Sequence, residues 1–218
     1  MKRNKITPVL SRKEREKHAR QQEILKAARE LFASKGYHNT TLEEIAHHAE
    51  FGKGTIYNYF NSKEELFYGI IDQLTSETLA LAQSAVNGSG GGAREKLTAY
   101  ARAMVSHARD NADLFHLVMR EIHRLNSEEF GAGLKLIGTR ARKVWEITAR
   151  PIAEEIRAQR IKPIDPLKLA ALFDGMVRIH CLNLFEKYRS PEGRGMGDSI
   201  EFVVSVFFDG VAQRKLKG

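Results

Sequence analysis

The sequence predicts an all-α fold, in which a small N-terminal helical unit precedes a larger C-terminal helical bundle. Apolar residues recur at intervals of three and four through most of the 218 residues, as in helices with one buried face. Helix start signals, such as Ser11-Arg12-Lys13-Glu14 and Asp165-Pro166, precede several of these stretches. No stretch alternates between apolar and polar residues in the way that a half-buried strand does. We therefore expect helices and no sheet.

The N-terminal helices are short and closely spaced. The first is predicted from a capping box at Ser11 to a glycine C-cap at Gly36. A second capping box at residues 41–44 begins a short helix that ends near residue 50. Residues 53–60 can form only about two further turns. A longer helix is then predicted over residues 62–86, with Ser as its N-cap.

A glycine-rich run separates these helices from the rest of the chain. Residues 87–92 hold four glycines in six positions, which cannot sustain a helix and indicate a flexible loop. Pro151 is expected to kink or divide the long helical segment in which it lies. The helical segments beyond the loop are predicted over residues 97–108, 114–125, 127–160, 165–187 and 198–216, with a loop over 189–197.

Composition excludes several classes of protein. Hydrophobic residues make up 42% and charged residues 28%, the balance of an ordinary globular chain. The single cysteine, Cys181, excludes an internal disulfide and any multi-cysteine metal site. No uncharged apolar run approaches the roughly 20 residues that span a bilayer, and no apolar region follows the basic residues 1–5 as in a signal peptide. A cytoplasmic protein is expected, with no membrane partner.

The basic excess is concentrated at the N-terminus. The chain carries 35 Lys and Arg against 27 Asp and Glu, a net charge of +8. Residues 1–22 alone hold eight basic and two acidic side chains, whereas residues 23–63 hold five of each. A basic arm of this kind is either a solvated leader or a segment that neutralises phosphates. The charge and helix patterns divide the chain into a basic arm (1–22), a domain of short helices (23–63) and a larger helical domain (64–218).

Two short helices joined by a tight turn fit a helix-turn-helix, whose second helix enters the major groove. Lys53 and Thr55 on the second helix could reach base edges. Tyr57 and Tyr59 carry hydroxyls on stiff side chains that could bind phosphates or pack on a thymine methyl, although tyrosines at this spacing also occur in cores. Thr41 and Lys63 begin helices, where free amides favour a phosphate, although a threonine there is most often only a cap.

Residues 24–67 resemble the TetR family of bacterial transcriptional regulators. The resemblance covers a fifth of the chain and rests on several coincident features: Gly36-Tyr37, Thr40-Thr41, Ile45-Ala46, Lys53-Gly54-Thr55-Ile56-Tyr57, Tyr59-Phe60 and Ser62-Lys63. It implies a homodimer on a palindromic operator, with the C-terminal helices forming the dimer interface and a ligand pocket. Carried over by position, Thr41, Tyr59 and Lys63 would hold phosphates. The residues implied to face the bases are Lys53, Gly54, Thr55 and Tyr57.

The turn departs from the family pattern of a glycine, an aliphatic residue and a serine, because it reads Glu50-Phe51-Gly52. A left-handed Glu50 would store strain on the order of 1 kcal/mol. Gly52 can cap the next helix but offers no hydroxyl to a phosphate. Glu43, on the exposed side of the second helix, would repel phosphate, accept a bond from a cytosine amino group, or only support its helix.

The C-terminal helices interleave polar and aromatic groups with apolar ones, which is usual for a small-molecule pocket but also fits surface or core roles. Arg178 suits an anionic effector, or a simple ion pair with Asp174. The residues predicted to contact an effector are Tyr100, Met104, His107, His116, Met119, His123, Trp145 and Arg178. The last two helices each carry a broad apolar face, which would form either core or a four-helix interface between two copies. The predicted interface residues are Phe173, Val177, His180, Leu184, Phe202 and Val206.

Neither a His-Glu-x-x-His motif nor a Walker-type phosphate loop occurs, so we expect no enzyme, no metal and no cofactor. The sequence predicts a dimeric, ligand-responsive DNA-binding regulator, a repressor released from its operator by a small molecule. The alternative is a helical interaction or ligand-binding protein whose DNA-reading head has lost specificity, since the turn is altered. The expected partners are operator DNA, a small-molecule effector and a second copy of the chain.

Overall fold

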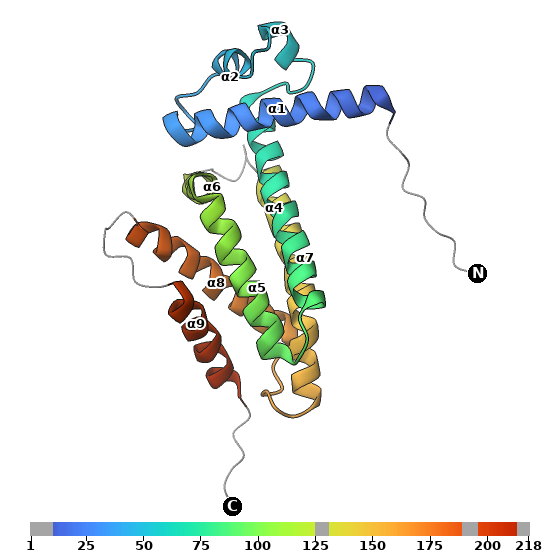
Figure 1. The fold of residues 1–218 in the computed structure, drawn as a ribbon, viewed down its shortest axis with the longest axis vertical. Helices are drawn as coiled ribbons and strands as arrows, with labels where there is room; N and C mark the ends of the chain where they lie inside the picture. Colours follow the sequence, from blue (N-terminus) through green and yellow to red (C-terminus); the bar gives the residue numbers. More distant parts are fainter. Residues whose placement is uncertain (1–10, 125–130, 189–195, 213–218) are drawn as a thin grey trace, which may run out of the picture. The chain divides into compact units, whose positions relative to one another are not determined.

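Helices account for nearly all the regular structure of the described chain (Figure 1). The structure is a computed structural model that describes residues 11–124, 131–188 and 196–212. Within these ranges the only strand-like backbone pairing is an isolated antiparallel bridge between Ile161 and Ala212. The all-α prediction is confirmed. The chain divides into two compact units, Met1–Ile70 and Ile71–Gly218, so the division lies seven residues beyond the predicted domain boundary at residue 63.

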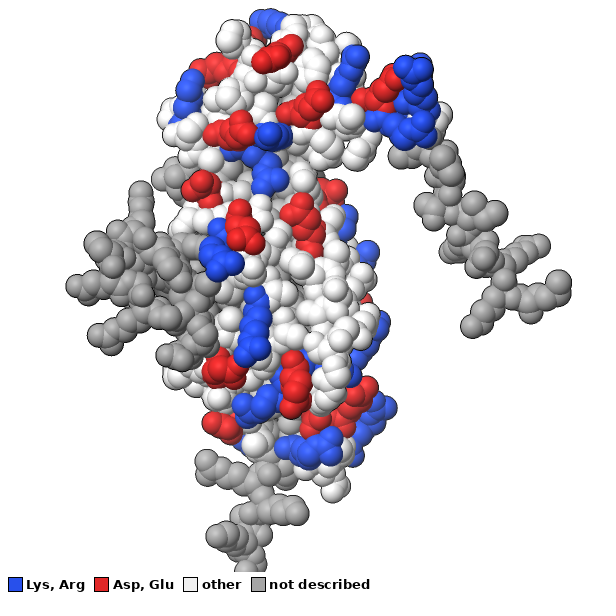
Figure 2. All heavy atoms as spheres, viewed as in Figure 1, with Lys and Arg blue, Asp and Glu red and all other residues white. Residues whose placement is uncertain are grey.

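Unit 1 (Met1–Ile70) contains α1 (Arg12–Lys35), α2 (Leu42–His48), α3 (Lys53–Ile56) and the beginning of α4 (Lys63–Gly88). The capping box at the start of α1 is confirmed: Ser11 Oγ accepts from the amide of Glu14, and Glu14 Oε2 accepts from the amide of Ser11. Helix α1 runs without a break past residue 22, so the second half of the basic arm forms its first turns. Figure 2 shows Lys and Arg gathered at this end of α1, where residues 11–20 are all exposed.

The short helices of unit 1 depend on its core, because isolated helices of seven and four residues are unstable in water. Helix α2 packs on α1 and α3 packs on α2. Ile45 of α2 and Ile56 of α3 are fully buried. Phe32, Tyr37 and Phe67 form an aromatic cluster with ring centroids 5.1–6.2 Å apart. This cluster joins α1 and the loop after it to α4, and fixes the frame that holds α2 and α3.

Unit 2 (Ile71–Gly218) is a helical bundle around one apolar core. Its helices are the rest of α4, then α5 (Ala93–Asp110), α6 (Ala112–Arg124), α7 (Gly131–Arg157), α8 (Pro166–Tyr188) and α9 (Met196–Val211). Helix α8 packs along α7, while α5 contacts α7, α8 and α9. Phe173 lies at the centre, fully buried, with its ring 4.9 Å from that of Phe207 and 6.4 Å from that of Tyr100.

Three local features of unit 2 test the sequence predictions. Asp165 Oδ1 accepts from the amides of Leu167 and Lys168, which confirms it as the cap of α8. Division of the long helix at Pro151 is wrong, because α7 continues through this buried proline. Helix α4 extends to Gly88, so the predicted loop contracts to residues 89–92.

Cys181 lies on α8 inside the core of unit 2 and is fully buried. Burial raises the pKa of its thiol to about 11, because a thiolate there would lose its hydration. In the described ranges, no helix has the length and apolar character needed to cross a membrane.

Candidate nucleic-acid interface

The turn between α2 and α3 contains the left-handed residue that the sequence analysis considered at Glu50. Glu50 has a φ of 59°, in the left-handed region that favours glycine. The backbone closes around it, since the amide of Phe51 donates to the carbonyl of Ala46 at 2.8 Å. Gly52 is the N-cap of α3 and makes no side-chain capping bond. The turn therefore keeps a helix-turn-helix shape but lacks a capping hydroxyl.

Glu50→Gly is expected to raise the free energy of unfolding by about 0.5 kcal/mol, because relief of about 1–2 kcal/mol of strain exceeds the added entropy of a glycine in the unfolded chain. Urea denaturation measures this change. Glu50→Ala is the matched control, since it removes the same carboxylate but keeps the Cβ and gives no stabilisation. If the free energy of unfolding of Glu50→Gly is no higher than that of Glu50→Ala, the backbone at residue 50 is not strained.

Helix α3 presents small and polar groups on its outer side. Ile56 is buried, whereas Lys53 and Gly54 are exposed and Thr55 is half-buried. A Cβ built on Gly54 meets no atom within 4 Å, so the packing of this chain gives no reason for a glycine there. The exposed strip leaves room for the close approach of another backbone or of a base edge.

The two tyrosines after α3 differ in exposure. Tyr57 is 43% exposed and is one of the large hydrophobic side chains on the surface of the described residues. Tyr59 is half-buried. A core role is therefore excluded for Tyr57, whose ring and hydroxyl stand beside Lys53 and Gly54 on an accessible surface.

Thr41 and Lys63, the predicted phosphate ligands, have partners inside unit 1. Thr41 Oγ1 accepts from the amide of Glu44, while Glu44 Oε2 accepts from the amide of Thr41. Lys63 Nζ donates to the carbonyls of Tyr37 at 2.9 Å and Thr40 at 3.0 Å, and lies 4.5 Å from the Tyr37 ring centroid. It also reaches the carbonyl of His38 at 3.4 Å. In this structure Lys63 thus holds the backbone carbonyls of the loop after α1. Its position at the start of a helix did not indicate this role.

Glu43 on α2 forms an ion pair with Lys53, the first residue of α3. Oε1 of the carboxylate lies 2.8 Å from Nζ of the lysine. The hydrogen bond between them lowers the pKa of Glu43 and raises that of Lys53. The two residues were treated separately in the sequence analysis. The available signal was a pair of opposite charges in the first turns of two consecutive short helices.

In unit 2, three of the predicted effector residues meet at one buried carboxylate. Asp174 accepts from the hydroxyl of Tyr100 at 2.5 Å, the indole nitrogen of Trp145 at 2.9 Å and Nε of Arg178 at 2.8 Å. Only 3% of the Asp174 side chain is exposed. Burial and the negative charge of Asp174 raise the pKa of Tyr100 well above its usual value. For Arg178, the ion pair with Asp174 is thus the observed state.

The other predicted effector residues are dispersed. Met104 is buried in the core, and His107 is half-buried, with Nε2 3.7 Å from the carboxylate of Glu77. His116 is exposed on α6, so the structure does not bring it to the Asp174 cluster. The side chains of Met119 and His123 lie outside the described residues.

The predicted dimer residues fall into two groups. Phe173 and Val177 are 0% and 2% exposed within a single chain, so assigning them to an interface is wrong. Their helix has apolar residues on more than one side, and these two face the core of their own bundle. Phe202 and Val206 are exposed, His180 is half-buried, and the side chain of Leu184 lies outside the described residues. Leu172 and Ile179 are exposed on α8 but are not among the six predicted interface residues.

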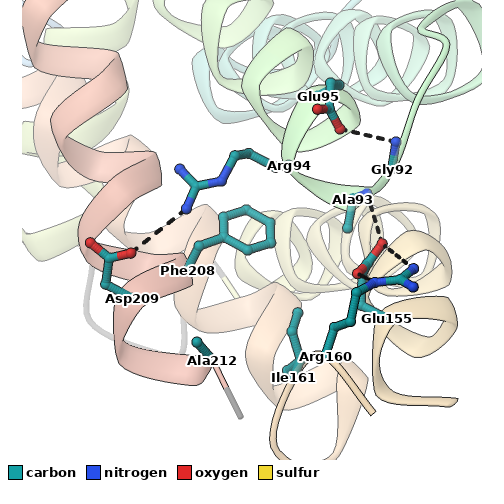
Figure 3. Close-up of a pocket in the computed structure, with 10 residues that line it drawn as sticks. All are labelled: Gly92, Ala93, Arg94, Glu95, Glu155, Arg160, Ile161, Phe208, Asp209 and Ala212. Carbon is teal, nitrogen blue, oxygen red and sulfur yellow. Dashed lines mark hydrogen bonds and ion pairs between the residues drawn. The ribbon is translucent and has the colours of Figure 1, made fainter. Parts of the chain in front are cut away.

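A cavity of about 250 Å³ lies where α5 begins, away from all the predicted effector residues (Figure 3). Its charged side chains face one another: Glu155 pairs with Arg160, and Arg94 lies 3.7 Å from Asp209. Glu155 also accepts from the first amide of α5. These groups satisfy each other. Across the described part of the chain, no group of three or more His, Cys, Asp or Glu residues could hold a metal ion.

Comparison with known proteins agrees with this geometry. The sequence model of "Bacterial regulatory proteins, tetR family" matches residues 24–69, which span α2, α3 and their turn. The uncharacterised HTH-type transcriptional regulator YhgD of Bacillus subtilis is 31% identical over 170 residues, covering 69% of this chain and 81% of YhgD. The HTH-type transcriptional regulator UidR of Escherichia coli is 37% identical over 65 residues, covering 30% of this chain and 33% of UidR.

Solved structures share the fold over most of the chain. A regulator of the TetR/AcrR family from Thermobifida fusca is 28% identical with a TM-score of 0.64, covering 90% of this chain and 100% of its own. The fatty acid degradation regulator FadR of Bacillus halodurans is 19% identical with a TM-score of 0.74, covering 89% and 97%. The chain belongs to the TetR family of bacterial regulatory proteins, and it is a DNA-binding transcriptional regulator rather than an enzyme.

Proposed function

We propose that the protein acts as a homodimer that represses transcription from a palindromic operator and leaves it when a small molecule binds unit 2. The observation that carries the proposal is an uncovered apolar surface on α8 and α9, which pack against each other. Leu172 is 56% exposed, Ile179 61%, Phe202 67% and Val206 46%. Exposed apolar side chains clustered on neighbouring helices mark surfaces that bind a partner.

Gly175 supports a second copy of the chain as that partner. It lies between Leu172 and Ile179 on the same side of α8, and a Cβ there would meet no atom within 4 Å. A glycine inside a helix costs roughly 0.5–1 kcal/mol relative to alanine. Among the described residues no atom lies within 4 Å of that Cβ, so the packing of one chain does not explain the glycine, and the close approach of a helix from a second copy would. Two α8–α9 pairs related by a two-fold axis would form a four-helix interface.

The Asp174 cluster supports an anionic effector. Arg178 uses Nε for Asp174, and none of the described residues accepts from its terminal nitrogens. These donors would pair with a carboxylate or phosphate group of a small molecule. Helix α4 belongs to both units, so it is the covalent route by which the effector changes operator binding. An effector shifts this equilibrium only by the difference between its affinities for the two states.

The test is selection of duplexes from a random pool by the full-length protein, followed by fluorescence anisotropy and a mass measurement in solution. We expect a palindromic sequence bound far more tightly than its scrambled version, and a dimer mass. Equal affinity for the selected and scrambled duplexes would instead favour a protein whose head has lost specificity. A mass that stays monomeric at all concentrations would contradict the dimer.

Deletion of residues 1–18 is expected to weaken operator binding and to flatten its salt dependence without changing the preferred sequence. The segment carries seven basic and two acidic side chains, and its described part is fully exposed, so unit 1 keeps its core. If about two to four phosphate contacts are lost, the slope of log K against log salt falls by a similar number. Anisotropy at several salt concentrations measures it; an unchanged slope would show that the arm is only a solvated leader.

A further inference from the structure

The ion pair between Glu43 and Lys53 joins α2 to the start of α3. These two helices and the turn between them, residues 42–56, are the DNA-reading head. The two side chains are 49% and 67% exposed, so the pair lies on the accessible surface and not in the core. The carboxylate lies 2.8 Å from the ammonium, so a DNA group that contacts the Lys53 ammonium also lies close to the Glu43 carboxylate. The hydrogen bond lowers the pKa of Glu43, so both groups are charged at neutral pH.

Lys53 is the one Lys or Arg side chain that α2, the turn and α3 can offer to DNA. Residues 42–62, which contain α2, the turn and α3, hold one lysine, no arginine and three glutamates. Glu43 therefore neutralises the one Lys or Arg cation of residues 42–62, in a segment that is already net negative. Glu44, by contrast, pairs with Lys35 of α1 and closes the capping box of α2.

Phosphates and base edges affect such a pair differently. A phosphate that binds Lys53 must displace Glu43 and then lie beside a carboxylate, and like charges repel. In the major groove, a guanine offers two acceptors to a lysine and its paired cytosine offers an amino donor to a glutamate. A G·C pair therefore satisfies both members of the ion pair at once, whereas the sugar-phosphate backbone satisfies only one.

We propose that Glu43 is a specificity-determining residue of the head: it weakens binding to non-operator DNA by holding Lys53 from phosphates, and it accepts from a cytosine in the operator. This inference rests on operator recognition as proposed above, and it names Glu43 as a residue that lowers the affinity for other DNA relative to the operator. It assigns Lys53 a partner-dependent role, since the lysine contacts a base only where that base pair also accommodates Glu43.

The test compares Glu43→Gln with Glu23→Gln, in the full-length protein, on a random-sequence duplex and on the selected operator. Glu23 is exposed on α1 and its change alters net charge equally. We expect Glu43→Gln to bind the random duplex about five- to tenfold more tightly, with a slope of log K against log salt steeper by about one, as one more phosphate is neutralised. Operator affinity should stay level or fall, so the ratio of the two affinities falls about tenfold. Equal effects of the two variants would overturn the proposal.

A second pair of variants asks whether Glu43 acts through Lys53. In a Lys53→Met background, Glu43→Gln should change random-duplex affinity by less than about twofold, because no ammonium remains to be released. A full five- to tenfold effect in that background would overturn the role of Lys53. The random-duplex arm needs no operator, so it measures Glu43 even if the wild type selects no preferred sequence, an outcome that would contradict only the proposed function. Thermal midpoints equal to that of the wild type confirm folding.

Discussion

Ile179→Glu is expected to convert the proposed homodimer to monomers and to weaken operator binding by at least about a hundredfold. The side chain is 61% exposed in a single chain, so the monomer tolerates a glutamate there. In the proposed two-fold interface the substitution occurs twice and places two carboxylates in an apolar surface, at a cost of several kcal/mol. A cost of about 4 kcal/mol corresponds to about a thousandfold in the dimer dissociation constant.

Operator affinity falls with the dimer because two linked heads bind as one unit, and separated heads lose about 10²–10⁴ in avidity. Sedimentation velocity and anisotropy on the selected operator measure the two effects. Ile164→Glu is the matched control: this isoleucine is 40% exposed but precedes α8, so the same substitution should leave the dimer intact. A dimeric Ile179→Glu protein would place the interface elsewhere.

Asp174→Asn is expected to lower the free energy of unfolding by about 3 kcal/mol. The substitution keeps the shape of the side chain but leaves the Arg178 guanidinium, whose side chain is 29% exposed, without its counter-charge. It also turns an acceptor of three hydrogen bonds into an amide whose nitrogen faces donors. For a chain of this length the loss corresponds to about 6–12 °C in the unfolding midpoint. Urea denaturation at one fixed protein concentration measures it, because the proposed dimerisation would also contribute to stability.

The double variant Asp174→Asn with Arg178→Met separates charge from shape. Removing both charges removes the uncompensated cation, so most of the lost stability should return. If the double variant is as unstable as Asp174→Asn alone, the loss comes from packing around residue 174 and not from the ion pair.

The sequence predicted those parts of the structure that depend on near neighbours. The capping boxes at Ser11 and Thr41 each involve residues three apart, and both are present. The left-handed backbone at Glu50 lies in the tight turn for which the sequence raised that possibility. Phe173 and Val177 failed as interface residues for a different reason: periodicity identifies an apolar face, but α8 has apolar residues on two sides. Only tertiary packing determines which side faces the core and which, with Leu172 and Ile179, faces outward.

The candidate site could be predicted in outline but not in its pairings. Gly54 and Tyr57 lie exposed on or directly after α3, as their positions suggested. The contacts of Lys63 with backbone carbonyls 23–26 residues away depend on how the loop after α1 folds back on α4. The Glu43–Lys53 pair likewise depends on the angle between two helices. No local pattern encodes such distances.

The burial of Cys181 has a practical consequence for thiol chemistry. With a pKa of about 11, roughly one thiol in 10⁴ is ionised at neutral pH, and the thiolate is the form that reacts with oxidants and alkylating reagents. The one cysteine of the chain is therefore a poor redox sensor and does not compete for labels. A cysteine introduced at exposed Asn58 would be the one reactive thiol of the folded protein, and a fluorophore or spin label attached there would report directly on the DNA-reading surface.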